Sequence, residues 1–367
     1  MKIMHMADIH LDARMETNLD KDKAKLRKQE LLATFSRAID YAADHEVDAI
    51  LIAGDLFDTA SPSATSKHLV HDLIINHSTI NFYILKGNHD GKDFLCDIEE
   101  ATNLHLFSGE WTGYPLNAQQ TIMLYGRELG SGSENTAALG LIPDPGKRNI
   151  VMLHGQEVSA SNAKKGELIP IKDFRNKGID YMALGHIHAP KVEKLDERGV
   201  YSYCGCLEGR GFDETGEHGF MLITISEEDL SVQYEFVPFA GRILHEIRVD
   251  VTGDDRTLSM KESIDHEIER TNPSPRDLIK IVLTGSVNAE EDHDLDYLKG
   301  CYEDQFFLVK VKDETIYRVS PEEYLKDASL KGEFVRLVLN DDTLSDAEKG
   351  RILHYGFQAL NGEEVGK

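Results

Sequence analysis

The sequence predicts a layered α/β fold, followed by a small α+β unit and a helical tail. In the first part of the chain, short β-branched runs alternate with helical patterns, which is typical of layered α/β proteins. Near 239–241 this pattern changes, and a β-α-β-α-β order begins. The length of 367 residues also exceeds that of one typical domain. We therefore expect a first domain at 1–240, a second at 241–320 and a helical tail at 321–367.

The first domain opens with three strands separated by two helices. Short apolar runs predict strands at 2–6, 48–53 and 81–85. Leu32, Phe35 and Ile39 recur at helical spacing and predict a helix between the first two strands. The two helices are expected at about 25–45 and 63–76.

Five further strands complete the first domain. They are expected at 121–125, 149–153, 181–184, 199–203 and 220–225. The run 130–137 is rich in Gly and Ser, which predicts an exposed loop.

The second part of the chain has its own pattern of strands and helices. Strands are expected at 244–251, 278–283 and 306–311, and helices at 258–270 and 295–302. From about Pro321 onward, apolar residues at helical spacing predict two more helices, at 333–339 and 346–360.

The composition is that of a globular protein with an acidic surface. Hydrophobic residues make up 41% and charged residues 29%, and the formal net charge is -25. Such a charge argues against binding nucleic acid through a broad basic surface. No apolar run approaches the roughly 20 residues that span a bilayer. Because no signal-peptide pattern is present and the four cysteines are few and scattered, we expect a cytoplasmic protein without a membrane segment.

Polar residues suited to metal binding follow five of the predicted strands. Each group comes directly after an apolar run, so it lies at the carboxyl end of a strand, where α/β sheets bind ligands. In two of the groups one residue separates the polar side chains, so both can point the same way. The groups are Asp8 with His10, Asp55, Asn88 with His89 and Asp90, His154, and His186 with His188.

These residue types predict a centre with two metal ions. Imidazole, carboxylate and carboxamide ligands without a thiolate suit Mn²⁺, Fe or Zn²⁺. The ligands are too many for one ion, and two ions sharing a carboxylate are the economical solution for phosphoryl transfer. A single histidine on an apolar strand is more often a core residue. We give that role to the unmatched histidines His5, His45, His68, His71, His77 and His105.

Together the five motifs resemble the signature of the calcineurin-like metallophosphoesterases. The motifs are Asp8-Ile9-His10, Gly54-Asp55, Gly87-Asn88-His89-Asp90, His154 and Gly185-His186-Ile187-His188. Within that superfamily, the segments 8–12, 53–59, 183–188 and 203–220 resemble SbcD-type DNA-repair nucleases. The resemblance implies a layered metallophosphoesterase β-sandwich flanked by helices, with a small α+β capping domain that helps to position DNA. The helical tail is not matched.

The resemblance also implies a role for each matched residue. One metal ion is held by Asp8, His10, Asp55 and His188, and a second by Asp55, Asn88, His154 and His186, with Asp55 bridging. His89 stabilises the transition state or protonates the leaving oxygen, and Asp90 is placed to orient its imidazole.

Four further residues are candidates for substrate contact because they flank the ligand loops. Their alternative role is ordinary surface or turn structure. They are Arg210, Gly205, Lys164 and Lys165.

The sequence departs from the family pattern at three positions. Asp58 stands where archaeal and eukaryotic members carry histidine and bacterial members commonly carry aspartate. Cys206 replaces a usual serine, and Asp12 replaces a usual glycine and adds negative charge near the cleft. The departure at Cys206 concerns contact with the substrate more than metal binding.

The function that the resemblance implies is a metal-dependent nuclease acting on DNA ends. The resemblance also implies a homodimer and a partner ATPase of the SbcC type. The chain itself contains no P-loop, so any ATP hydrolysis must come from a partner. The helix at 63–76 is a candidate dimer surface, and packing on its own sheet is the alternative. The alternative is a phosphodiesterase or phosphatase for nucleotides or other small substrates. Such an enzyme would use the same metal ligands and would explain the negative net charge better than a DNA nuclease. The complete ligand set disfavours a third possibility, a binding scaffold with a decayed site.

Overall fold

The computed structural model shows two compact units, Met1–Arg242 and Ile243–Lys367. The predicted loop at 130–137 lies, apart from its two ends, outside the described residues. In the part of the chain that is described, no helix combines the length and the apolar character needed to cross a membrane. The described residues are 1–15, 19–91, 95, 101–130, 137–158, 167–254, 256–289, 293–318, 324 and 326–362.

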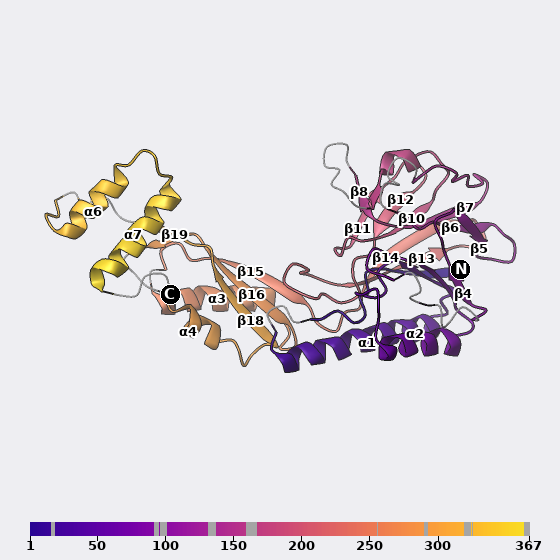
Figure 1. Ribbon diagram of the computed structural model, residues 1–367, viewed down its shortest axis with the longest axis horizontal. Helices are drawn as coiled ribbons and strands as arrows, with labels where there is room; N and C mark the ends of the chain where they lie inside the picture. Colours follow the sequence, from indigo (N-terminus) through magenta and orange to yellow (C-terminus); the bar gives the residue numbers. More distant parts are fainter. Residues whose placement is uncertain are drawn as a thin grey trace. The chain divides into compact units, whose positions relative to one another are not determined.

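The first unit contains a six-stranded mixed sheet with the order β14-β13-β1-β2-β3-β4. Strands β1 to β4 run parallel, and β13 and β14 are antiparallel to them. Two helices cover one face of this sheet, as Figure 1 shows, and bury Leu31 and Phe35 against Met4 and Ile50. The elements are β1 (Lys2–Met6), β2 (Ala49–Ala53), β3 (Asn81–Leu85), β4 (Leu104–Leu106), β13 (Gly219–Ile225), β14 (Val232–Pro238), α1 (Lys21–Asp44) and α2 (Ala64–Asn76).

A second six-stranded sheet has the order β11-β12-β10-β7-β6-β5. Its central strands β6, β7, β10 and β12 run parallel, and the outer strands β5 and β11 are antiparallel. The two sheets pack face to face, with Ile3 and Leu51 of the first sheet in one core with Ile150 and Ala183 of the second. The elements are β5 (Thr112–Pro115), β6 (Ile122–Gly126), β7 (Arg148–His154), β10 (Tyr181–Gly185), β11 (Lys191–Lys194) and β12 (Val200–Tyr203), with the short β8 (Gln156–Glu157), β9 (Leu168–Ile169) and η2 (Ile171–Phe174) beside them.

Helix α2 packs its apolar face on its own sheet. Val70, Leu73 and Ile74 are buried in the core between the helices and the first sheet. Packing on the sheet therefore accounts for the helical spacing of the apolar residues in α2. At its N-terminus, Asp12 accepts hydrogen bonds from the backbone N–H of Ser63 (2.6 Å) and the hydroxyl of Ser66 (2.7 Å). The charge of Asp12 thus faces the positive end of a helix dipole.

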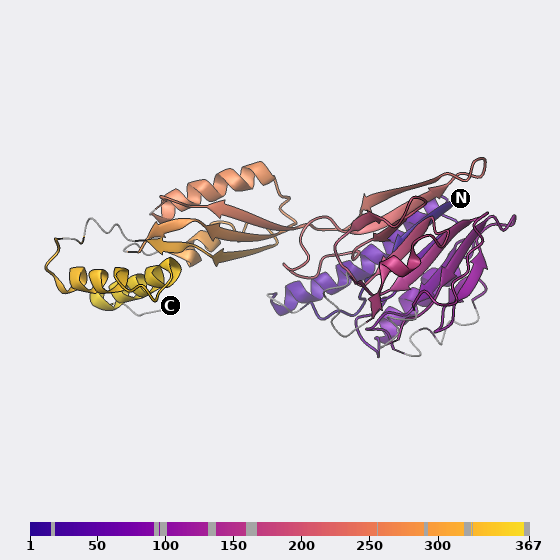
Figure 2. The ribbon, with the colours of Figure 1, turned by 90° about the horizontal axis from the view of Figure 1, so that it is seen from above.

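The second unit is built on a three-stranded parallel sheet, β15-β16-β18. Figure 2 shows α3 along this sheet, where Met260 and Ile264 join Ile247 and Ile279 in one core. The tail helices pack within the same unit: the ring of His354 on α7 stacks on Tyr317 at 3.7 Å. The elements are β15 (Leu244–Asp250), α3 (Thr257–Thr271), β16 (Leu278–Thr284), β17 (Ser286–Asn288), α4 (Leu295–Gly300), β18 (Leu308–Asp313), β19 (Ile316–Arg318), α6 (Leu330–Leu339) and α7 (Asp346–Asn361).

The predicted α/β fold is confirmed, and the missed strands lie mainly at sheet edges. Strands β4, β5, β11 and β14 were absent from the expected elements. In β11 and β14 every side chain is exposed or half-buried, so neither strand has a fully buried face. The alternation of Val232, Tyr234 and Phe236 with polar residues in β14 is a strand pattern that the sequence analysis missed.

One histidine is buried between the two sheets. His5 on β1 is fully buried, and its Nδ1 lies 3.0 Å from the hydroxyl of Tyr181 on β10. Burial lowers the pKa of His5 to about 3, because a charged imidazole is poorly solvated there. Since the unfolded chain takes up this proton near pH 6.5, folding becomes less favourable as the pH falls below that value.

We predict that His5→Gln flattens the acid side of the stability profile. Between pH 6 and pH 4 the free energy of unfolding of the unmodified protein should fall more steeply, by about 1.4 kcal/mol per pH unit. Urea unfolding in the presence of a chelator measures this, with fluorescence as the signal. Trp111 is the single tryptophan of the chain and lies in the first unit, so the signal reports that unit.

The exposed His71 provides the control, since His71→Gln should leave the profile unchanged. Equal slopes for His5→Gln and the unmodified protein would contradict the assignment of His5 as a neutral core residue.

Candidate metal centre

The carboxyl ends of five parallel strands, three from one sheet and two from the other, meet at one edge of the sandwich. Strands β1, β2 and β3 run parallel in the first sheet, as do β7 and β10 in the second. All seven predicted metal ligands follow or end these strands, and the structure brings them together. The ligands are Asp8, His10, Asp55, Asn88, His154, His186 and His188.

The backbone at this edge adopts conformations that few residues other than glycine accept. Asp8, His10 and Asp55 each have φ of 51°, and His186 has φ of 101°. Hydrogen bonds from the N–H of Asp8 to Gly54 and from the N–H of His10 to Asp55 join the two loops. Residues held in this region cost folding energy and concentrate at functional sites.

Two glycines leave room for the ligand side chains. A Cβ atom at Gly54 would overlap the ring of His154, and a Cβ atom at Gly87 would overlap the carboxylate of Asp55. Gly54 also has φ of 90°, which a side chain would make unfavourable. Both positions therefore require glycine if the ligands are to reach one another.

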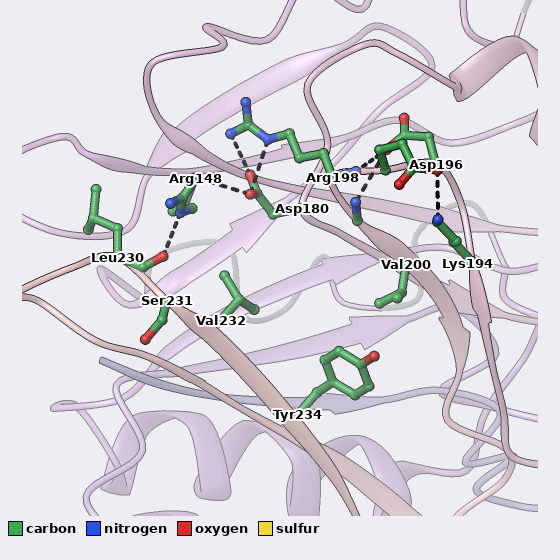
Figure 3. Close-up of a pocket in the computed structure, with 12 residues that line it drawn as sticks. Arg148, Asp180, Lys194, Asp196, Arg198, Val200, Leu230, Ser231, Val232 and Tyr234 are labelled. Atoms are coloured by element: carbon green, nitrogen blue, oxygen red, sulfur yellow. Dashed lines mark hydrogen bonds and ion pairs between the residues drawn. The ribbon is translucent and has the colours of Figure 1, made fainter.

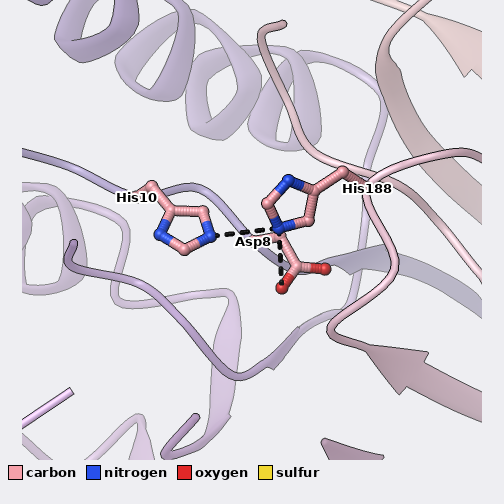
Figure 4. Close-up of side chains that lie close together, drawn as sticks. All are labelled: Asp8, His10 and His188. Carbon is pink, nitrogen blue, oxygen red and sulfur yellow. Dashed lines mark hydrogen bonds and ion pairs between the residues drawn. The ribbon is translucent and has the colours of Figure 1, made fainter. Parts of the chain in front are cut away.

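The first group of ligands contains Asp8, His10 and His188 (Figure 4). The Nε2 atoms of His10 and His188 face each other at 3.3 Å, and Nε2 of His188 lies 3.9 Å from Oδ1 of Asp8. The opposite ring nitrogens face carboxylates. Nδ1 of His10 lies 3.0 Å from Oδ1 of Asp58, and Nδ1 of His188 lies 2.6 Å from Oε1 of Glu214.

This arrangement directs the lone pairs on Nε2 of His10 and Nε2 of His188 toward one point. A carboxylate beside Nδ1 favours the tautomer with its proton there, which leaves Nε2 as an acceptor. Two such Nε2 atoms at 3.3 Å repel each other unless a proton or a metal ion lies between them. The donor set of the first group therefore fits a cation.

The second group of ligands contains Asn88, His154 and His186. Oδ1 of Asn88 lies 3.1 Å from Nε2 of His154 and 3.1 Å from Nδ1 of His186. Nδ1 of His154 is 2.9 Å from the carbonyl oxygen of Ala53, so its Nε2 points into the group. Oδ2 of Asp55 lies 3.5 Å from Nε2 of His154 and 3.7 Å from Nε2 of His10, between the two groups.

Buried charges in the centre shift the pKa values of its residues. Burial lowers the pKa of His10 and of His186 to about 4, which keeps both imidazoles neutral. Burial also raises the pKa of Asp8 to about 6. At His154 burial acts to lower the pKa, but the hydrogen bond and charge of Asp55 outweigh it and raise the pKa to about 9. A neighbouring carboxylate thus outweighs burial and raises the pKa at His154 and His188, whereas His10 and His186 stay neutral.

His89 and Asp90 do not contact each other in the expected way. Asp90 was expected to orient the imidazole of His89, but its buried carboxylate accepts the backbone N–H groups of Leu56, Phe57 and Gly87. The exposed imidazole of His89 faces Asp58, whose Oδ1 lies 3.9 Å from Nδ1. Asp90 therefore shapes the loop that carries Asp55, and Asp58 is the carboxylate nearest to the imidazole of His89.

The candidate substrate contacts differ in their surroundings. The guanidinium of Arg210 is bound by Asp58 at 3.0 Å and by Glu214 at 2.9 Å. Gly205 has φ of 77°, and a Cβ atom there would press on the carbonyl oxygen of His188, so its glycine shapes the ligand loop. Lys164 and Lys165 lie outside the described residues.

Two carboxylates of this centre escaped the sequence prediction. Glu214 contacts His188 and Asp58 contacts His10, although neither was expected to do so. Asp58 lies three residues after Asp55, so its proximity to the centre could have been inferred from the strand end. Glu214 lies in an irregular segment between β12 and β13, and no sequence pattern predicts its contact with His188.

A hollow of about 430 Å³ opens beside the first group of ligands and is lined by Arg14, Asp58, Arg210 and Glu214. A second hollow, of about 410 Å³, lies at the opposite ends of β7 and β10. Figure 3 shows Arg148 and Arg198 of that hollow directed at Asp180. The first hollow belongs to the metal centre because Asp58 and Glu214, which line it, contact His10 and His188, whereas the second lies at the strand ends away from the ligands.

Comparison with known proteins defines the class to which this fold and site belong. Residues 1–190, about half of the chain, match the calcineurin-like phosphoesterase family. The chain therefore belongs to the calcineurin-like phosphoesterases, which are metal-dependent phosphoester hydrolases with a dinuclear metal site.

The curated relatives narrow the comparison. The uncharacterized metallophosphoesterase YhaO of Bacillus subtilis is 28% identical over 77% of this chain and 71% of its own length. The DNA double-strand break repair protein Mre11 of Sulfurisphaera tokodaii is 28% identical over 77% of this chain and 73% of that protein. Its counterpart in Methanosarcina acetivorans is 24% identical over 94% of this chain and 56% of that protein. The predicted family and the predicted kinship with DNA-repair nucleases are confirmed.

We predict that Asp90→Ala destabilises the first unit by about 2–4 kcal/mol, because three buried N–H groups lose their charged acceptor. Unfolding in urea followed by Trp111 fluorescence measures the change. Asp72→Ala removes an exposed carboxylate and should change stability by less than about 0.5 kcal/mol. A loss as small as that for Asp90→Ala would show that Asp90 does not hold the loop.

Proposed function

We propose that this protein is a nuclease that hydrolyses phosphodiester bonds at DNA ends with two divalent metal ions. In this proposal, Asp8, His10, Asp55 and His188 hold one ion, and Asp55, Asn88, His154 and His186 hold the other. Mn²⁺ is the proposed metal, with Fe or Zn²⁺ as alternatives.

The observation that supports the metal sites best is the pair of facing Nε2 atoms. With metal–nitrogen bonds of about 2.1 Å, two imidazoles on one ion have their nitrogens roughly 3–3.4 Å apart. The separation of 3.3 Å between His10 and His188 is of that size. The position of Asp55 between the two groups supports its role as the bridging carboxylate.

The protein's own residues position and protonate the substrate. When bound, two such ions activate water and stabilise the negative charge that develops on the phosphate. His89 is exposed beside the ligands, and its backbone N–H donates to Oδ1 of Asp55 at 2.9 Å. This bond places the imidazole at the mouth of the site, where it can donate a proton to the leaving oxygen. Nδ1 of that imidazole lies 3.4 Å from the backbone carbonyl oxygen of Asp58, which can orient the ring.

Basic side chains of the second unit are the candidates for contact with DNA, despite the net charge. On the face of its sheet opposite α3, Glu246, Lys280 and Lys310 form one row across the three strands. Arg248 and Lys312 lie in the neighbouring row. Glu246 and Glu314 bind Arg248, Lys280 and Lys312, so a phosphate backbone would have to compete with these carboxylates for the cations. We propose that this unit caps the nuclease domain and positions DNA.

The relatives named as DNA double-strand break repair proteins suggest the setting of this activity. We propose that the chain forms a homodimer and acts in DNA repair with an SbcC-like ATPase. The described cysteines Cys204, Cys206 and Cys301 are free thiols, which supports a reducing compartment such as the cytoplasm. A phosphodiesterase for nucleotides remains the alternative, because it would use the same metal centre.

Hydrolysis assays and metal analysis on the purified protein together test this proposal. With Mn²⁺ we expect two ions per chain and cleavage of linear duplex DNA, and Asp55→Ala should lose both ions because both share its carboxylate. The substrates are a linear duplex, a single-stranded circle and a chromogenic phosphodiester.

The assay separates the two candidate functions. Turnover of the small phosphodiester without cleavage of either DNA would favour the nucleotide-level enzyme. One ion per chain, or loss of only one ion in Asp55→Ala, would contradict the dinuclear site.

We predict that His89→Ala keeps both metal ions and lowers turnover by about 10²–10⁴-fold, the usual effect of removing a general acid. His186→Ala is the matched control, because this change should remove a ligand and weaken metal binding. Metal content and initial rates are measured on the same preparations. A metal-free His89→Ala protein would show that His89 is a ligand and not the proton donor.

A further inference from the structure

Arg210 connects two carboxylates that face different histidines. Its Nη1 donates to Oδ1 of Asp58 at 3.0 Å, and its Nη2 donates to Oε1 of Glu214 at 2.9 Å. The backbone N–H of Arg210 also donates to Oε2 of Glu214 at 2.7 Å. The side chain of Glu214 is only 7% exposed and that of Arg210 23%, so solvent screens the ion pair little.

Each of the two carboxylates lies beside one histidine of the first group, with a hydrogen bond to His188 and an ion-pair contact to His10. Glu214 lies 2.6 Å from Nδ1 of His188, and Asp58 lies 3.0 Å from Nδ1 of His10. The result is a continuous chain of contacts from one imidazole to the other, and its middle member is Arg210. At the other side of the two rings, the Nε2 atoms face each other at 3.3 Å.

We propose that Arg210, Asp58 and Glu214 form a positioning clamp that sets the tautomer and the separation of His10 and His188. This inference rests on the proposed function and deepens it, since the clamp sets the affinity of the metal position shared by these histidines. The clamp residues come from the loop after β2 and from the segment between β12 and β13. The clamp therefore also joins the ligand loops of the two sheets.

The charges explain why an arginine is needed at the centre of the clamp. Without a cation between them, the carboxylates of Asp58 and Glu214 would repel each other and move apart. A guanidinium is permanently charged and presents several N–H groups in a fixed plane, so it binds two carboxylates at once. Lysine keeps the charge but lacks this geometry.

The clamp also gives Arg210 a role other than contact with the substrate. Its N–H groups are directed at Asp58 and Glu214. Nη2 also lies 3.1 Å from Nδ1 of His188, and this approach is not a hydrogen bond in the proposed tautomer, because both nitrogens then carry protons. A guanidinium held in this way acts through the ligands. Two variants that keep the overall shape separate this role from binding of a phosphate: Arg210→Lys and Glu214→Gln.

The test measures Mn²⁺ affinity and stoichiometry of the full-length protein by competition with a fluorescent chelator. We expect both variants to keep one ion at the original affinity and to bind the other about 10–100-fold more weakly, the usual effect of removing a residue that orients a metal ligand. The electron paramagnetic resonance spectrum should change from that of coupled ions to that of an isolated ion at subsaturating Mn²⁺. Trp111 fluorescence confirms that the first unit is folded.

Arg198→Lys is the matched control. Arg198 binds Asp180, which precedes β10 and so lies at the end of that strand opposite to His186. This change should leave both Mn²⁺ affinities unaltered.

Each remaining outcome decides against a specific statement. Unchanged Mn²⁺ affinities in Arg210→Lys and Glu214→Gln would overturn the clamp and leave the proposed function intact. A raised KM with unchanged Mn²⁺ affinity would also overturn it and assign Arg210 to substrate binding. If the unmodified protein bound no Mn²⁺, both the clamp and the proposed metal-dependent function would fail.

Discussion

The face-to-face packing of two sheets is the constraint on which the site depends. Neither sheet alone carries a complete set of ligands, because Asp8, His10, Asp55 and Asn88 follow strands of one sheet and the three other histidines follow or end strands of the second. The core that contains Ile3, Leu51 and Ile150 fixes the separation of the sheets. A larger side chain in that core would move the ligands of one sheet away from those of the other. The apolar layer therefore sets the geometry of the polar centre.

The polar centre in turn stores unfavourable energy that the fold must offset. Buried carboxylates and neutral imidazoles lie within a few ångströms of one another, and several ligands hold left-handed backbone conformations. The surrounding hydrogen bonds show how this arrangement is maintained. Asp90 accepts three backbone N–H groups beneath the loop of Asp55, and both oxygens of Asp8 accept the N–H of His186. Residues that never meet a substrate therefore decide whether the ligands can be held in place.

Much of the fold could be predicted from the sequence, because buried strands and amphipathic helices leave periodic patterns. The strand at 81–85 has the predicted bounds, and α2 begins one residue after the predicted start because Ser63 is its cap. Strand β14 was missed although Val232, Tyr234 and Phe236 alternate with polar residues, and it is held at the sheet edge by pairing with β13. The convergence of the ligands was predictable because parallel strands that end at one edge must bring their following residues together.

The partners of the ligands were less predictable, because they depend on contacts between segments distant in the sequence. Glu214 reaches His188 across 26 positions, and Asp90 bonds to backbone groups more than 30 positions away. The sequence analysis expected Asp90 to orient the neighbouring His89. In the structure the Asp90 carboxylate instead accepts hydrogen bonds from backbone N–H groups of the loop. Sequence adjacency is thus a poor guide to hydrogen-bond partners in irregular loops.

The left-handed backbone of the first ligand loop also bears on how such chains should be compared. Asp8, His10 and Asp12 all have positive φ, a conformation that aspartate, asparagine and histidine tolerate better than β-branched residues. Selection for the shape of the loop alone would therefore preserve aspartate and histidine at these positions after catalysis had been lost. His154 and His188 are under no such conformational demand, since φ is negative at both. Among diverged copies of this fold, loss of these two histidines would be the clearer mark of an extinct enzyme.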